Sequence, residues 1–144
     1  MPSVTDCERE IEELHALFVR WYRGRADRDE FGRVERALGG SFELVSPDGL
    51  VSDRETVLAG VREQYDSRTG FDIEIRNVEA VDIEGDRALV RYEEWQSGQT
   101  GPGATGRLST ALFAPPGTTD GDPGTRPAAR WLYLQETWLD GPEP

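Results

Sequence analysis

The sequence contains no lysine, so arginine supplies all 16 of its basic side chains, against 28 aspartate and glutamate residues. The formal net charge is therefore −12 at pH 7, and the isoelectric point lies near 4.5. Such a negative surface repels phosphate groups, which argues against nucleic acids and anionic membranes as partners. Acidic residues spread evenly along the chain are typical of a halophilic-type protein from a salt-rich cytoplasm, where salt screens the repulsion between them.

Cysteine and histidine each occur once, as Cys7 and His15. A single cysteine excludes an internal disulfide and any zinc site built from paired cysteines, and we predict that Cys7 is a small residue in the core or at its boundary. His15 has no second histidine or carboxylate at metal-ligand spacing around it, so no metal or other cofactor is expected. Because it borders the apolar stripe of a predicted helix, two interpretations stay open for it: a partly buried or surface side chain, or a base in a pocket.

Long apolar runs are missing as well. No stretch approaches the roughly 20 apolar residues that span a membrane, and the N-terminus lacks the basic and apolar regions of a signal peptide. We therefore expect a cytoplasmic protein without a membrane partner. The length of 144 residues suggests a single domain, 1–144, with a core at about 5–139.

Three segments carry the pattern of a helix start, a capping residue followed three positions later by glutamate. They are Thr5–Glu8, Asp27–Glu30 and Ser52–Glu55. Apolar side chains at helical spacing follow each of them, most extensively in the first segment, which predicts an amphipathic helix there. The acidic run at 10–13, with the sequence EIEE, is predicted to be a solvated part of the first helix.

From Gly70 onward the sequence alternates between apolar and polar residues, which predicts β-strands. The strands are expected at 71–83, 88–96, 107–114 and 130–139, and a small hairpin is expected at 42–45 and 50–51. The link at 115–128 is rich in glycine and proline and is expected to be mobile. Strands in meander order pair antiparallel, and amphipathic helices can cover one face of their sheet, so the predicted fold class is α+β.

The chain resembles the nuclear transport factor 2-like superfamily in five segments that occur in this order: FELVSPDG, RETVLAGVREQY, GDRALVRYEEWQ, GRLSTALF and WLYLQETWL. Within that superfamily it looks most like the uncharacterised SnoaL-like domains. The resemblance implies a cone-shaped fold of the cystatin-like roll type, a curved antiparallel sheet packed on three N-terminal helices. It also implies an apolar pocket inside the cone, and often a homodimer.

The catalytic residues of ketosteroid isomerases, another group of the superfamily, do not carry over to this chain. That group places an aspartate base before the proline of the first hairpin, where this chain has Ser46. Its oxyanion tyrosine corresponds by spacing to a place near Val19, and the nearest phenol here belongs to Tyr22. The resemblance therefore does not imply steroid isomerisation by that mechanism.

A row of charged side chains is predicted at one end of the sheet. Folding the strands about their links places Glu94 opposite Arg107 and Tyr92 opposite Ser109. If the second link is symmetric, Arg107 also lies near Glu136. One face of the sheet is then apolar at one end and carries a carboxylate–arginine–carboxylate row at the other, so we expect it to face the pocket.

The opposite face of these strands is expected to lie outside or at a dimer contact, because interfaces favour tryptophan, tyrosine and arginine. Its predicted members are Arg91, Glu93, Trp95, Trp131, Tyr133 and Gln135.

Two classes of function stay open for the pocket. The first, which we favour, is a domain without catalysis that binds a small apolar ligand or mediates self-association, with the charged row as a clamp. The second is a cofactor-independent enzyme of isomerase, dehydratase, cyclase or epoxide-hydrolase type, since a carboxylate–arginine–carboxylate set can orient and deprotonate water. The catalytic candidates are Glu94, Arg107, Glu136 and Tyr92. The ligand-binding candidates are Phe18, Trp21, Tyr22, Phe42, Ser109, Leu134 and Trp138.

Overall fold

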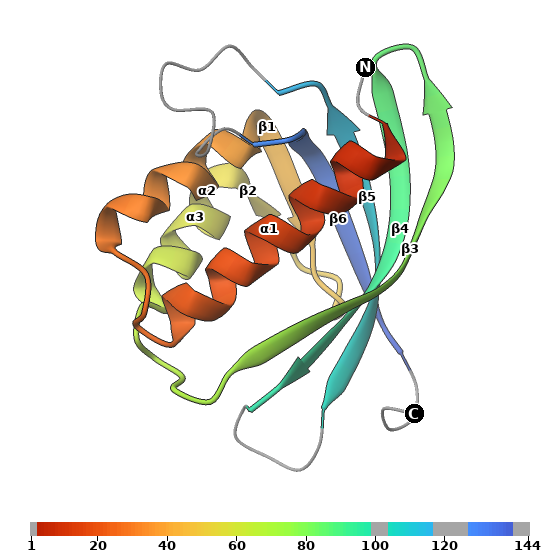
Figure 1. The fold of residues 1–144 in the computed structure, drawn as a ribbon. Coiled ribbons are helices and arrows are strands. Elements are labelled where there is room, and N and C mark those ends of the chain that lie inside the picture. The colour runs from red at the N-terminus through yellow and green to blue at the C-terminus, as the bar shows by residue number, and fades with distance from the viewer. Residues whose placement is uncertain (1–2, 99–103, 117–126, 140–144) are drawn as a thin grey trace.

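The structure, a computed structural model, describes residues 3–98, 104–116 and 127–139. Its helices and strands follow one another along the chain as Figure 1 shows. They are α1 (Val4–Tyr22), the 3-10 helix η1 (Arg28–Glu30), α2 (Phe31–Ala37), β1 (Leu38–Val45), β2 (Val51–Asp53), α3 (Arg54–Glu63), β3 (Asp72–Glu84), β4 (Arg87–Ser97), β5 (Thr105–Ala114) and β6 (Arg130–Trp138). Most of the link at 115–128, for which mobility is predicted, lies outside the described residues.

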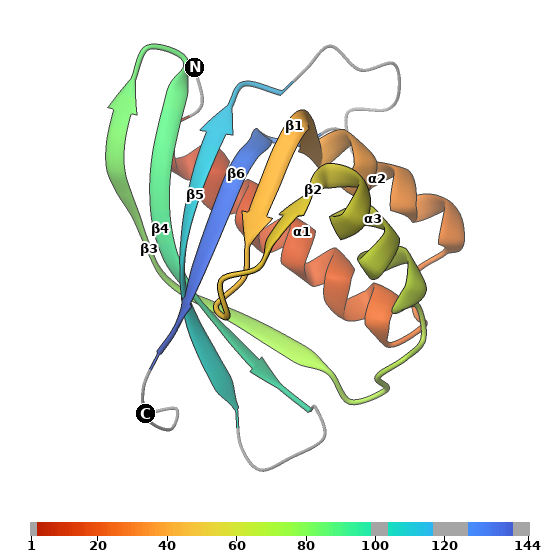
Figure 2. The same cartoon turned by 180° about the vertical axis from the view of Figure 1, so that it is seen from behind.

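The strands form one six-stranded sheet in the order β2-β1-β6-β5-β4-β3. The sheet curves, and the three α-helices lie on one side of it, whereas its other face carries no helix from the described residues (Figure 1 and Figure 2). The predicted α+β fold is confirmed, with one difference. β1 and β6 pair in parallel, so the sheet is mixed rather than wholly antiparallel. None of the described helices is both long enough and apolar enough to cross a membrane.

Three of the four described helices begin at residues that capping chemistry favours. The box predicted at Asp27–Glu30 is present at the start of η1. α1 begins slightly earlier than the predicted Thr5, because the hydroxyl of Ser3 accepts a backbone N–H at 3.1 Å. α3 is capped by Asp53, one position after the predicted cap, and its carboxylate accepts a backbone N–H at 2.9 Å.

α1 lies along the sheet and buries its apolar stripe, as its helical spacing predicts. The indole of Trp21 donates to the Val61 carbonyl at 2.7 Å and so joins α1 to α3. Cys7 is fully buried, as predicted for a small core residue, and this burial raises the pKa of its thiol to about 11. The prediction for the acidic run at 10–13 is wrong for its first residue, because Glu10 is fully buried.

The pairing of β4 with β5 has the predicted register, with Glu94 opposite Arg107 and Tyr92 opposite Ser109. The pairing of β5 with β6 is displaced by two residues, because Ser109, and not Arg107, lies opposite Glu136. A displacement of two residues leaves every side chain on its own face of a sheet. Glu136 therefore still lies on the inner face, close to Arg107.

A bulge in the pairing of β5 with β6, between Leu112 and Phe113, changes the face of the residues beyond it. Trp131 consequently pairs with Phe113, and their ring centroids lie 4.6 Å apart in the core. The prediction that Trp131 belongs to the outer face is wrong, since only 1% of this residue is exposed.

Candidate functional site

A cavity lies inside the cone between the three α-helices and the inner face of the sheet. Its volume is about 170 Å³, close to that of engineered protein cavities that take up benzene. Most of its wall is apolar and includes Phe18, Phe42, Val57, Val61, Trp131 and Leu134. Its polar side chains are His15, Tyr22, Glu94, Gln96, Arg107 and Glu136.

Alternation along the strands gathers most of these polar groups in one part of the wall. Glu94 and Gln96 are two residues apart on β4, so both side chains face the cavity. Arg107 lies opposite Glu94 on β5, and Glu136 follows on β6. His15 comes from α1, which packs against β3 and β4.

His15 and Glu94 form a buried hydrogen-bonded pair in the cavity wall. His15 Nδ1 lies 2.7 Å from the carbonyl oxygen of Ile11, and since a carbonyl oxygen only accepts, Nδ1 carries a hydrogen. His15 Nε2 lies 3.0 Å from Glu94 Oε1, and the other Glu94 oxygen accepts from Gln96 Nε2 at 2.6 Å. A bare nitrogen would repel a carboxylate oxygen, so one proton lies between Nε2 and Oε1.

The surroundings of this pair favour its ionised form. Burial lowers the pKa of His15, but the charge of Glu94 and the hydrogen bonds to Glu94 and Ile11 outweigh burial and raise this pKa above 6.5. Burial raises the pKa of Glu94, but His15, Arg107 and Gln96 outweigh it and hold this pKa at about 2. Both pKa shifts therefore favour the proton on Nε2 and a negative charge on Glu94.

Arg107 and Glu136 form a second charged pair, with Nη1 donating to Oε1 at 3.2 Å. The guanidinium carbon lies 4.8 Å from the ring centroid of Trp138, which covers it. Burial and the charge of Glu94 raise the pKa of Glu136, although Arg107 and His15 lower it. The two carboxylates of the cavity are thus shifted in opposite directions, so Glu136 takes up a proton more readily than Glu94 does.

The structure brings together most of the predicted site residues in the cavity wall. They are Glu94, Arg107, Glu136, Phe18, Tyr22, Phe42 and Leu134. Tyr92 and Ser109 are instead fully buried as a cross-strand pair, and Trp21 lies in the core between α1 and α3. Trp138 is 43% exposed, and its indole donates to Asp48 Oδ1 at 3.2 Å.

Two polar residues of the wall, Gln96 and His15, are not among the site candidates chosen from the sequence. Gln96 is absent from the candidates, although strand alternation from Glu94 would place it on the same face. His15 lies in the wall of the pocket, which is one of the two interpretations that its sequence context left open. Across the described ranges, no group of three or more histidine, cysteine, aspartate or glutamate side chains is arranged to hold a metal ion.

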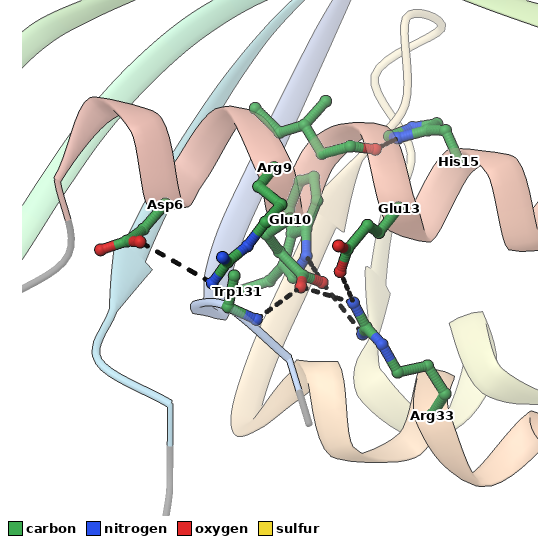
Figure 3. A network of polar contacts seen from close by, with 9 residues as sticks. Asp6, Arg9, Glu10, Glu13, His15, Arg33 and Trp131 are labelled. Atoms are coloured by element: carbon green, nitrogen blue, oxygen red, sulfur yellow. Dashed lines mark hydrogen bonds and ion pairs between the residues drawn. The ribbon is translucent and has the colours of Figure 1, made fainter. Parts of the chain in front are cut away.

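Glu10 on α1 is the centre of a separate buried network (Figure 3). It accepts from Arg33 Nη1 at 3.1 Å and Nη2 at 2.6 Å, from Trp131 Nε1 at 3.0 Å and from the Ala128 amide at 3.0 Å. Burial raises the pKa of Glu10, although all of these donors lower it. The network joins α1 and α2 to the start of β6, and it fixes Trp131, whose ring forms part of the cavity wall.

Neither a protein-family model nor a curated protein matches the chain. Solved structures do. An NTF2-like protein of unknown function from Pseudomonas aeruginosa is 27% identical with a TM-score of 0.79, over 94% of this chain and 99% of that one. An NTF2-like protein of unknown function in nutrient uptake from Rhodospirillum rubrum is 14% identical with a TM-score of 0.63, over 92% and 98%. A CaMKII hub from S. rosetta is 11% identical with a TM-score of 0.66, over 94% and 95%.

These similarities extend over almost the whole of each chain. They show that this chain has the NTF2-like fold. Another similar structure is described as having a cystatin-like fold. The expected resemblance to the nuclear transport factor 2-like superfamily is confirmed.

Proposed function

We propose that the cone cavity binds a small, mainly apolar molecule. The observation that carries this proposal is the division of the cavity wall, which is apolar over most of its area and polar where five side chains from four elements meet. Apolar cavities with a few convergent polar groups are the usual form of small-molecule sites in proteins. The volume of about 170 Å³ suits a ligand built around a single ring.

Narrowing the cavity tests this function. Val57 lies in the wall, and Val57→Phe adds a ring to the space that the ligand would fill. Val51→Phe makes the same chemical change at a position that is 64% exposed, and it is the matched control. Each protein is purified without denaturation, and small molecules released from it are identified by mass spectrometry. Wild type and Val51→Phe should release the same compound, and Val57→Phe should not.

The result is interpreted together with the stability of each variant, since overfilling a core costs about 1–3 kcal/mol. Urea unfolding of both variants shows whether Val57→Phe remains folded. A compound released equally by all three proteins would place binding elsewhere on the molecule.

A second candidate is proton-transfer chemistry in the same cavity, for which the contact of 3.0 Å between His15 Nε2 and Glu94 Oε1 is the motivating observation. In that reading Glu94, Arg107, Glu136 and Tyr92 are the groups of interest, as expected from the sequence. The raised pKa of Glu136 beside the ionised Glu94 separates an acid from a base, as general acid–base catalysis requires. Incubating small cyclic ketones with the protein in heavy water, and following deuterium uptake by NMR, tests this activity. No exchange above that of Glu94→Gln would exclude it for those substrates.

Self-association is the third element of the proposal. A second copy would pack on the outer face of the sheet, where the described part of the chain places no helix (Figure 2). Leu108, Leu112 and Tyr133 on this face are partly exposed, and two of the similar structures are a CaMKII hub and a CaMKII association domain. We expect a homodimer, and a native mass spectrum would show its mass. Leu108→Glu should produce the monomer if this face is the contact, because it would bury two unpaired charges.

The charge of −12 supports a location in a salt-rich cytoplasm. Screening of the repulsion between acidic groups should then raise the unfolding temperature as potassium chloride is added. An unfolding temperature that is independent of salt would contradict this.

A further inference from the structure

The charges in the cavity wall are balanced. Four side chains of the wall besides Tyr22 are ionisable, the cations His15 and Arg107 and the carboxylates Glu94 and Glu136. Each cation is hydrogen-bonded to one carboxylate, His15 to Glu94 at 3.0 Å and Arg107 to Glu136 at 3.2 Å.

The balance at His15 does not depend on where the shared proton lies. Nδ1 donates to the Ile11 carbonyl, so the proton between Nε2 and Oε1 is the only one that can move within the pair. On nitrogen it gives an imidazolium and a carboxylate, and on oxygen it gives a neutral ring and a neutral acid. The sum of the charges is zero in both cases.

The charge of Arg107 is balanced by Glu136, and the two side chains are mostly buried together. Only 16% of the Arg107 side chain and 7% of the Glu136 side chain are exposed, so little solvent reaches this pair to screen it. Arg68, the other cation close to Tyr22, stacks over the Tyr22 and Phe71 rings at 5.8 Å and 5.3 Å and is not part of the wall. No cation or carboxylate in the described part of the wall lacks a partner of opposite charge.

A charged ligand would therefore add an unpaired charge to a space with little water, which is costly. An uncharged hydroxyl or carbonyl group adds none, and it can form hydrogen bonds with the Tyr22 hydroxyl, Arg107 or Glu136. We infer that the cavity selects an uncharged alcohol or ketone of single-ring size and rejects carboxylate and ammonium ligands of the same shape. This inference rests on the proposed function, since it names the chemical class of the ligand.

Four probes that share one ring and differ in their substituent test the inference. They are benzyl alcohol, toluene, benzoate and benzylamine, titrated into the full chain at neutral pH and followed by amide chemical shifts in the NMR spectrum. We expect benzyl alcohol to bind at least about tenfold more tightly than benzoate or benzylamine, and more tightly than toluene.

Variants that change one charge of the wall test whether charge balance causes the selection. Glu136→Gln leaves Arg107 without its carboxylate, so benzoate should bind this variant about tenfold more tightly than it binds wild type. Arg107→Gln leaves a carboxylate unpaired and should improve the binding of benzylamine instead. Glu93→Gln removes the same charge as Glu136→Gln from the outer face of β4, and it should leave all four affinities unchanged.

The outcomes separate the inference from the function on which it rests. Benzoate or benzylamine binding wild type as tightly as benzyl alcohol would overturn the selection against charge and leave the cavity as a binding site. Equal affinities for toluene and benzyl alcohol would contradict the inference that the cavity selects a ligand with a hydroxyl or carbonyl group. Failure of all four probes to bind would count against the proposed function itself. The comparison of probes on wild type decides these points even if a variant does not fold.

Discussion

His15 on α1 and Glu94 on β4 are 79 positions apart in the sequence and join through a hydrogen bond of 3.0 Å between Nε2 and Oε1. This hydrogen bond links α1 to the inner face of the sheet beside the cavity. It also means that the two adjacent glutamates of β4 differ completely in their surroundings. Glu93 lies on the outer face and accepts from Asn77 at 2.7 Å and from the Trp95 indole at 3.0 Å.

Glu94→Gln should therefore destabilise the protein far more than Glu93→Gln. The first change removes a buried carboxylate that is hydrogen-bonded to His15, and we expect a loss of about 1–3 kcal/mol. The second removes a partly exposed carboxylate on the outer face, and it should cost less than about 1 kcal/mol. Urea unfolding at pH 6 measures both. Equal and negligible losses would mean that the His15 bond contributes nothing to stability.

The same pair should make stability depend on pH at both ends of its range. The folded pKa of Glu94 is lowered from 4.5 to about 2, so its contribution is complete above pH 4.5 and is lost as the pH falls towards 2. The folded pKa of His15 is raised above 6.5, so its contribution is complete below pH 6.5 and is lost as the pH rises through the folded value. The pair therefore stabilises the fold most between about pH 4.5 and 6.5.

NMR measures this directly, because His15 is the only histidine of the chain. Its ring signals should titrate above pH 6.5 in wild type, and at lower pH in Glu94→Gln, where burial remains and the carboxylate charge is gone. Glu93→Gln should leave the titration unchanged. A wild-type titration below pH 6.5 would mean that burial outweighs Glu94.

The sequence predicts the local part of this site well. Alternation along β4 separates Glu94 from Glu93, and the short link to β5 sets the pairing of Glu94 with Arg107. The pairing of β5 with β6 follows a longer link, whose symmetry the sequence does not reveal, and its prediction is wrong by two residues. The bulge that places Trp131 on the inner face cannot be predicted from the apolar pattern of the strand sequences either.

Partners far apart in the sequence account for the remaining differences. Glu10 looks like a solvated residue at the start of a helix, because its burial depends on Arg33, Ala128 and Trp131, which lie 23, 118 and 121 positions away. The parallel pairing of β1 with β6 likewise joins distant strands. Sequence patterns report the residues of one element, whereas these features depend on which elements meet.

Glu10→Gln should be strongly destabilising, although glutamine has nearly the same shape as glutamate. Each Glu10 oxygen accepts two hydrogen bonds, and the amide would present a donor to two of those donors. We expect a loss of about 3–5 kcal/mol, since Arg33 would lose its buried partner. Glu13→Gln is the control, because Glu13 is about half exposed and lies 3.6 Å from the same Arg33. Similar unfolding free energies for the two variants would contradict a structural role of the Glu10 network.

Gly106 on β5 should tolerate no side chain, because the ring of Trp95 lies directly against it. A Cβ atom at this position would lie 2.5 Å from Trp95 Cζ3 and 2.6 Å from Cη2, and the ring is held on its strand opposite Gly106. Gly106→Ala should cost about 1–3 kcal/mol, the usual cost of overfilling a packed site. Gly60→Ala is the matched control, since Gly60 lies inside α3 with open space around it, and alanine should stabilise the helix there by about 0.5–1 kcal/mol. Urea unfolding should therefore move in opposite directions for the two substitutions. A stabilised Gly106→Ala variant would show that the Trp95 ring can leave this position freely.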